Sequence, residues 1–93
     1  MVAPINNSVN KKVLKLLPQE KKGKYLFNGS FVSTRTALDK LGSEVIAAAY
    51  IILLKKVKEK GGLDYLQVFE IDGQRLWFID DVTHVTALLP EDY

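Results

Sequence analysis

The sequence predicts an α+β domain in which an antiparallel sheet of about four to five strands packs against one long helix. An apolar stretch with helical spacing runs through residues 36–60. Short aromatic-rich stretches, separated by turn signals, flank it on both sides. Because strand-like stretches occur before and after a single helix, we expect a short N-terminal helix followed by the order β-β-α-β-β-β. The long helix should then lie across one face of the sheet.

The length of 93 residues corresponds to one domain. Residues 1–23 are interpreted as a basic N-terminal arm, and residues 24–93 as a single α+β domain. Within the arm, the pattern over Lys11–Leu17 predicts a short helix. Pro18 disfavours helical geometry at the residue before it, so this helix should end there.

Two dipeptides predict tight hairpin turns. Asn28-Gly29 and Asp72-Gly73 both lie between apolar stretches, and these residue types best tolerate the positive φ angles of a type I′ turn. The first turn predicts strands near 24–27 and 30–34. The second predicts strands near 64–71 and 75–79. A last strand over 84–89 alternates apolar and polar residues, which is typical of a half-buried edge, and it should end at Pro90.

The long helix has recognisable start and stop signals. Thr36 followed by Asp39 resembles a capping box. Gly42-Ser43 predicts either a kink or a break with a second start at Ser43. Gly61-Gly62 should end the helix.

The apolar residues of this helix form two stripes instead of one. The first stripe is Leu38, Leu41, Val45, Ala48, Ala49 and Ile52. The second stripe is Ile46, Tyr50, Leu53 and Val57. A surface helix usually has one apolar stripe about 100° wide, whereas residues 45–54 are apolar around the whole circumference. We therefore expect cover on more than one side, from the N-terminal helix or from a second copy of the protein. The candidate protein-interface residues are Ile46, Tyr50, Leu53 and Trp77.

Several function classes lack the residues they need. The chain has no cysteine, which excludes disulfides, thiol catalysis and cysteine-bound metals. His84 is the single histidine, and with Asp80 and Asp81 it falls short of a zinc ligand set, so we interpret it as an edge-strand histidine. No nucleophile elbow or phosphate-binding loop is present. We therefore predict no catalytic, metal or cofactor-binding residues and no enzymatic activity.

The sequence also bears on location. The longest apolar run, Val45–Leu54, has ten residues, whereas a membrane-spanning helix needs about 20. Residues 1–10 are mostly polar and lack the apolar core of a signal peptide. We therefore expect a cytoplasmic protein.

Charge is distributed unevenly along the chain. Residues 1–35 carry seven Lys or Arg side chains against Glu20 alone, and residues 63–93 carry seven Asp or Glu side chains against Arg75 alone. One interpretation is that the basic segment lies on the acidic segment, within a protomer or between two. Another is that the acidic segment imitates a phosphate backbone and binds a basic groove of another protein, as an inhibitor or adaptor would.

A third interpretation is nucleic-acid binding by the basic arm. Lysines would neutralise phosphates, and Tyr25, Phe27 and Phe31 on the predicted hairpin would stack on bases. Arginine, which favours base readout, is scarce. The candidate nucleic-acid contacts are Lys11, Lys12, Lys15, Lys21, Lys22, Lys24 and Arg35.

One stretch resembles a known family. Asp64-Tyr-Leu-Gln-Val-Phe-Glu-Ile71, directly after the apolar helix and before a hairpin, is similar to the central signature of a small uncharacterised protein family of Firmicutes and their mobile elements. The resemblance covers about residues 25–80. It implies a similar order of elements, but that family has no assigned activity, so it implies no site residues.

Together these observations predict a small non-enzymatic binding module that self-associates or binds a protein partner. The alternatives are a nucleic-acid-binding regulator that uses the basic arm, and a mobile-element inhibitor or adaptor with an acidic face. No membrane association and no small-molecule substrate are expected.

Overall fold

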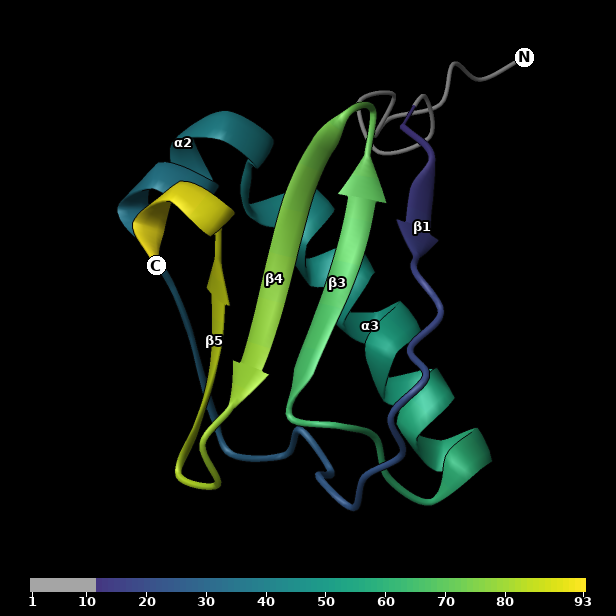
Figure 1. The fold of residues 1–93 in the computed structure, drawn as a ribbon. Coiled ribbons are helices and arrows are strands. Elements are labelled where there is room, and N and C mark those ends of the chain that lie inside the picture. Colours follow the sequence, from purple (N-terminus) through teal and green to yellow (C-terminus); the bar gives the residue numbers. More distant parts are fainter. Residues whose placement is uncertain (1–11) are drawn as a thin grey trace, which may run out of the picture.

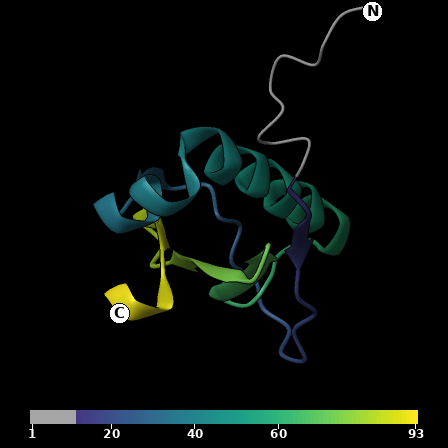
Figure 2. The same ribbon diagram turned by 90° about the horizontal axis from the view of Figure 1, so that it is seen from above.

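The computed structural model describes residues 12–93, which form an α+β fold with a five-stranded, mostly antiparallel sheet and two α-helices. The elements in chain order are β1 (Leu14–Leu16), β2 (Ser30–Ser33), α2 (Arg35–Leu41), α3 (Ser43–Lys60), β3 (Leu66–Ile71), β4 (Gln74–Asp80), β5 (His84–Leu88) and the 3-10 helix η1 (Pro90–Asp92). Both α-helices lie on the same side of the sheet (Figures 1 and 2).

The strand order across the sheet is β1-β3-β4-β5-β2. β1 pairs antiparallel with β3, β3 with β4, and β4 with β5, whereas β2 pairs parallel with β5. The two strands nearest the N-terminus therefore form the two opposite edges of the sheet. The predicted antiparallel sheet is confirmed except at β2.

The core lies between the sheet and α3. Alternate residues of a strand point to opposite faces, and in β3 and β4 one of the two sets is fully buried, as Phe69 and Phe78 show. These aromatic rings contact each other edge to face, with centroids 5.5 Å apart. On the helix, Ala49 and Leu53 are also fully buried and belong to the same cluster.

The predicted short helix over Lys11–Leu17 is wrong in the part that the structure describes. Leu14–Leu16 is a strand that pairs with β3, and Leu17 N–H continues the pairing by donating to the carbonyl of Val68. Leu14 and Leu16 alternate with Lys15, so the pattern also satisfies the two-residue period of a strand. Without β1, backbone N–H and C=O groups along one edge of β3 would lack partners, and pairing with them favours a strand over a helix. This part of the basic arm belongs to the sheet, whereas Lys11 and the residues before it lie outside the described residues.

The predicted hairpin at Asn28-Gly29 is also wrong. Tyr25 makes a single bridge to Leu63 in place of the strand expected over 24–27, and β2 pairs with β5. Gly29 passes so close to the β4–β5 turn that a Cβ there would lie 2.6 Å from the carbonyl oxygen of Thr83. This glycine therefore permits a close backbone approach, which sequence alone does not distinguish from a tight turn.

The second predicted hairpin is confirmed. Asp72 and Gly73 connect β3 to β4 with φ angles of 49° and 84°, so both central residues have the positive φ of a type I′ turn.

The single long helix expected over residues 36–60 is two helices. Gly42, with φ of 85°, separates α2 from α3, which is the break that Gly42-Ser43 indicated. The first helix begins earlier than predicted, because Thr34 and not Thr36 is the N-cap and accepts a hydrogen bond from Ala37 N–H. The predicted end is confirmed, since Gly61 adopts the left-handed conformation at the C-cap.

The last strand differs from the prediction in position. β5 lies between β4 and β2, so it is an internal strand and His84 is not on an edge. Within residues 12–93, no helix has the length and apolarity needed to cross a membrane.

Candidate functional site

The most exposed apolar region of α3 is the side that faces away from the sheet. Ile51 is 55% exposed, and Ile52 and Leu54 are each 37% exposed. We define the outer α3 surface as Ala47, Ala48, Ile51, Ile52 and Leu54. Because none of the elements within residues 12–93 packs over it in Figure 2, this surface presents branched aliphatic side chains to solvent.

Charged residues border the outer α3 surface at both ends. Glu44 precedes Ile51 by seven residues and Lys58 follows it by seven residues, and both are exposed. Seven residues make about two helical turns, so all three side chains lie on one side of the helix. The outer α3 surface therefore has a negative end, an apolar centre and a positive end.

The predicted protein-interface residues are mostly in the core, and this corrects the sequence analysis. Ile46 and Leu53 are buried, with exposed fractions of 2% and 0%. Tyr50 is half-buried, and its ring stacks on Phe31 and on Phe78, with ring centroids 4.5 and 5.9 Å away. The physical reason is that the sheet covers the second apolar stripe together with part of the first.

Trp77 is the one predicted interface residue that points away from the helices. Its neighbours Leu76 and Phe78 are fully buried on the helix side, whereas Trp77 lies half-buried on the other face. Tyr93 contacts it edge to face, with ring centroids 5.6 Å apart. The C-terminal residue thus covers part of this tryptophan.

Ile51 and Leu54, which dominate the outer α3 surface, are not among the interface residues predicted from the sequence. Neither residue belongs to the two stripes, because at 100° per residue both side chains lie on the part of the helix circumference that the two stripes leave over. The signal was nevertheless present, since residues 45–54 are apolar around the whole helix and some of them had to remain outside one sheet.

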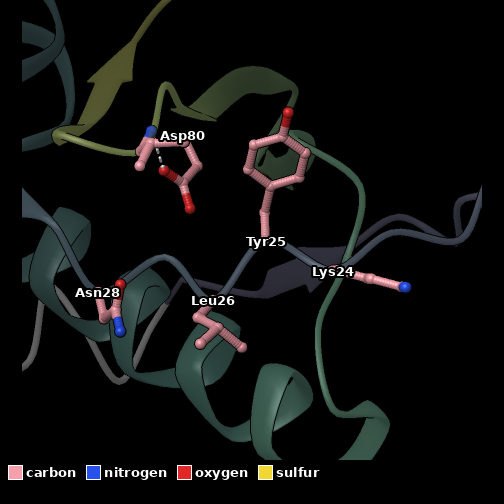
Figure 3. A pocket seen from close by; sticks show the side chains of 6 residues that line it. Lys24, Tyr25, Leu26, Asn28 and Asp80 are labelled. Atoms are coloured by element: carbon pink, nitrogen blue, oxygen red, sulfur yellow. Dashed lines mark hydrogen bonds between the residues drawn. The ribbon is translucent and has the colours of Figure 1, made fainter.

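A small pocket of about 320 Å³ lies beside Lys24, Tyr25 and Asp80. Figure 3 shows the Lys24 side chain pointing away from the Asp80 carboxylate, so the two do not form an ion pair. Asp80 is buried and accepts hydrogen bonds from Phe27 N–H at 2.9 Å and Val82 N–H at 2.7 Å. Both carboxylate oxygens are thereby occupied by backbone groups, and Asp80 acts as a structural anchor between two loops.

Tyr50 completes this anchor from the helix side. Its hydroxyl donates a 2.6 Å hydrogen bond to the carbonyl of Phe27, the residue whose N–H binds Asp80. Phe27 has φ of 55°, a strained conformation for a bulky side chain. Burial, and secondarily the negative charge of Asp80, raise the pKa of Tyr50. The phenol therefore stays protonated as a donor that holds Phe27 in place.

Three of the basic residues proposed to bind nucleic acid are either opposite acidic residues or at the far edge of the sheet. Lys12 lies 3.7 Å from Asp72, and Lys15 stands opposite Glu70 in the β1–β3 register. Arg35 begins α2, directly after β2, which is at the opposite edge of the sheet from β1. At β1, therefore, part of the basic segment lies on the acidic segment, as the first charge interpretation expected.

The three aromatic residues expected to stack on bases all contact other parts of the protein, and one of them is fully buried. Phe27 is fully buried, and Phe31 is 39% exposed and stacks on Tyr50. Tyr25 is 38% exposed and contacts Tyr65 at a ring distance of 6.3 Å. The aromatic platform that single-stranded nucleic acid requires is therefore not assembled beside the lysines of the described arm.

The acidic residues of the last third are held by separate local contacts. Glu70 lies 3.9 Å from Arg75, and Glu91 accepts a 3.2 Å hydrogen bond from Lys40. Asp92 accepts hydrogen bonds from Leu89 N–H and from the Thr34 hydroxyl, and these lower its pKa. Together with the buried Asp80, these contacts leave no acidic surface that uses the whole segment.

His84 belongs to a polar turn between β4 and β5. Asp81 accepts hydrogen bonds from His84 N–H at 2.7 Å and from the Thr83 hydroxyl at 3.0 Å, and these interactions lower the pKa of Asp81. The Thr83 hydroxyl also lies 3.0 Å from Nδ1 of His84. Among residues 12–93, no three His, Asp or Glu side chains come together in a way that could hold a metal ion.

No family model matches the chain, and no curated protein or solved structure is significantly similar to it. The resemblance of residues 64–71 to the Firmicutes family therefore stays a prediction.

Proposed function

We propose that this protein is a small non-enzymatic interaction module that pairs with a second copy of itself through the outer α3 surface. The observation that carries the proposal is the exposure of Ile51 at the centre of an apolar helix face. Large aliphatic side chains gathered on one exposed face mark a site of association more often than isolated ones do.

The charge order along α3 favours a second copy as the partner. In an antiparallel helix pair with its two-fold axis at Ile51, Glu44 of one copy lies opposite Lys58 of the other, because each is seven residues from the axis. A two-fold interface repeats every contact twice, so this arrangement gives two opposite-charge pairs.

Small residues near the axis support close packing of the two helices. Ala47 and Ala48 lie one turn before Ile51, and their short side chains leave room for the larger Ile51 and Leu54 of a second copy. One helix pair buries less than the roughly 800 Å² per partner of a standard interface. We therefore expect dissociation constants in the micromolar range.

Sedimentation velocity or light scattering over a series of concentrations tests the proposal with the wild type and Ile51→Glu. The wild type should shift from the monomer mass of 10.5 kDa towards twice that value as concentration rises. Ile51→Glu should remain monomeric, because a carboxylate at the axis would meet its own copy and lose hydration.

The matched control is Leu26→Glu, which makes the same kind of change at an exposed residue outside α3. Leu26 is 47% exposed, so this variant should dimerise like the wild type. Circular dichroism shows whether both variants fold. A wild type that is strictly monomeric at high micromolar concentration would refute the proposal, as would a folded Ile51→Glu variant that dimerises normally.

A further inference from the structure

A larger cavity, of about 600 Å³, lies at the C-terminal end of α3, away from the outer α3 surface. The loop 17–23 forms one wall, the last two turns of α3 form another, and Leu63 and the β3 residue Gln67 also line it. Its volume is within the range of about 300–1,000 Å³ that is typical of small-molecule sites. We call it the lysine cavity.

Four lysines line this cavity, and they come from two segments far apart in the sequence. Lys21 and Lys22 belong to the loop, and Lys56 and Lys60 lie one turn apart on α3. Glu20 is the acidic residue among the described lining side chains, and Glu59, which does not line the cavity, lies 3.5 Å from Lys56 as an exposed ion pair. The sequence places the loop lysines in the basic arm, and only the fold brings them to the same cavity as Lys56 and Lys60.

The lysine cavity also has an apolar part. Leu16, Leu17, Pro18 and Leu63 line it, and Leu16 and Leu63 pack against the hydrophobic core. Gln67, only 2% exposed, is the most buried polar residue on its wall, and its amide donates to the carbonyl of Asp64 at 3.0 Å. Hydrocarbon surface and ammonium groups therefore face the same space.

We propose that the lysine cavity binds an amphipathic anion, with a carboxylate or sulfonate head and a hydrocarbon body. Lys60 holds the head together with Lys56, whose exposed pair with Glu59 is weak enough to be exchanged for the ligand, and the body lies against Leu17 and Leu63. The cavity has no aromatic side chain for base stacking and no arginine for bidentate phosphate contacts, so nucleic acid fits it poorly. Inorganic phosphate would leave its apolar wall unused.

Fluorescence titration with anilinonaphthalene sulfonate, an amphipathic anion, tests this inference on the full chain. The double variant Lys56→Gln/Lys60→Gln should bind the probe about tenfold more weakly, the loss expected for two half-exposed ion pairs. Lys15→Gln/Lys55→Gln removes the same charge from residues that do not line the cavity, so it should bind like the wild type. Dodecanoate should displace the probe, and neutral dodecanol should do so much less.

The Ile51→Glu variant separates this inference from the proposed dimer. It should keep its probe affinity, because Ile51 does not line the lysine cavity. Loss of binding in Ile51→Glu, with retention in Lys56→Gln/Lys60→Gln, would place the probe on the outer α3 surface and overturn the inference. Displacement by a single-stranded oligonucleotide or by phosphate, but not by dodecanoate, would also overturn it.

Discussion

The inner and outer faces of α3 have similar residues and different roles. On the inner face, Ala49 and Leu53 are fully buried against the sheet. On the outer face, Ala47 and Ile51 of the same helix contact solvent. Hydrophobicity is therefore not what distinguishes the two faces of this helix. The distinction comes from which face meets the sheet, and the remaining apolar face is what supports an interaction role.

The first prediction compares substitutions on the two faces of α3 and has the largest expected effect. Leu53→Ala should lower the free energy of unfolding by about 2–5 kcal/mol, because it leaves a cavity in the core. Ile51→Ala should change it by less than about 1 kcal/mol, because Ile51 is half in solvent and alanine favours helix. Urea unfolding followed by the fluorescence of Trp77 measures both.

These unfolding experiments belong at protein concentrations well below the dimer dissociation constant, so that association does not add to stability. Leu54→Ala is a second outer-face variant, at 37% exposure. Equal destabilisation by Leu53→Ala and Ile51→Ala would contradict the burial of Leu53 and the exposure of Ile51.

The second prediction concerns Tyr50, at the boundary between the two faces. Tyr50→Phe keeps the stacked ring and removes the hydrogen bond to the Phe27 carbonyl, so it should lower stability by about 0.5–1.5 kcal/mol at neutral pH. Burial raises the pKa of Tyr50 in the folded state above its ordinary value of 10.0. The stabilisation from this phenol is therefore present below that value and is lost as pH rises through the folded-state pKa.

The stability difference between the wild type and Tyr50→Phe should accordingly shrink in alkaline solution. Denaturant unfolding at neutral pH and above pH 10 measures this difference. A difference that stays constant or grows with pH would argue against the hydrogen bond as its source. Tyr65→Phe, at an exposed tyrosine, is the control for general alkaline effects.

The third prediction concerns the outer α3 surface alone and has the smallest expected effect. Glu44→Lys should weaken dimerisation about fivefold, because each of two symmetric exposed pairs contributes roughly 0.5 kcal/mol. The double variant Glu44→Lys/Lys58→Glu restores opposite charges in the antiparallel arrangement and should regain wild-type affinity. Sedimentation at low salt measures the series, and a double variant no better than the single one would contradict that arrangement.

Local chemistry made several parts of the fold predictable. Asp72-Gly73 tolerates the positive φ of its turn, and Gly61 tolerates the left-handed C-cap, so both boundaries follow from residue type. β3 and β4 were predicted because they combine aromatic and branched residues directly around such a turn. No distant partner was needed to recognise these features.

The N-terminal elements were mispredicted because distant partners decide them. Leu14–Leu16 is a strand because the edge of β3 is there to pair with it, although its pattern also suits a short helix. Asn28-Gly29 has the sequence of a hairpin turn, yet Gly29 is needed because the backbone passes close to Thr83 and leaves no room for a side chain. Each pairing joins residues more than 50 positions apart, a separation at which local propensity carries no information.

The candidate sites divide in the same way. The sequence by itself determined that residues 45–54 form a helix that is apolar on every side, since side-chain types and spacing are local properties. Only the tertiary structure decided that Ile51 stays outside and Leu53 inside, because that depends on how the helix is rotated against the sheet. It also placed Lys21 and Lys60 on the lining of one cavity, because only folding brings a loop to a helix end.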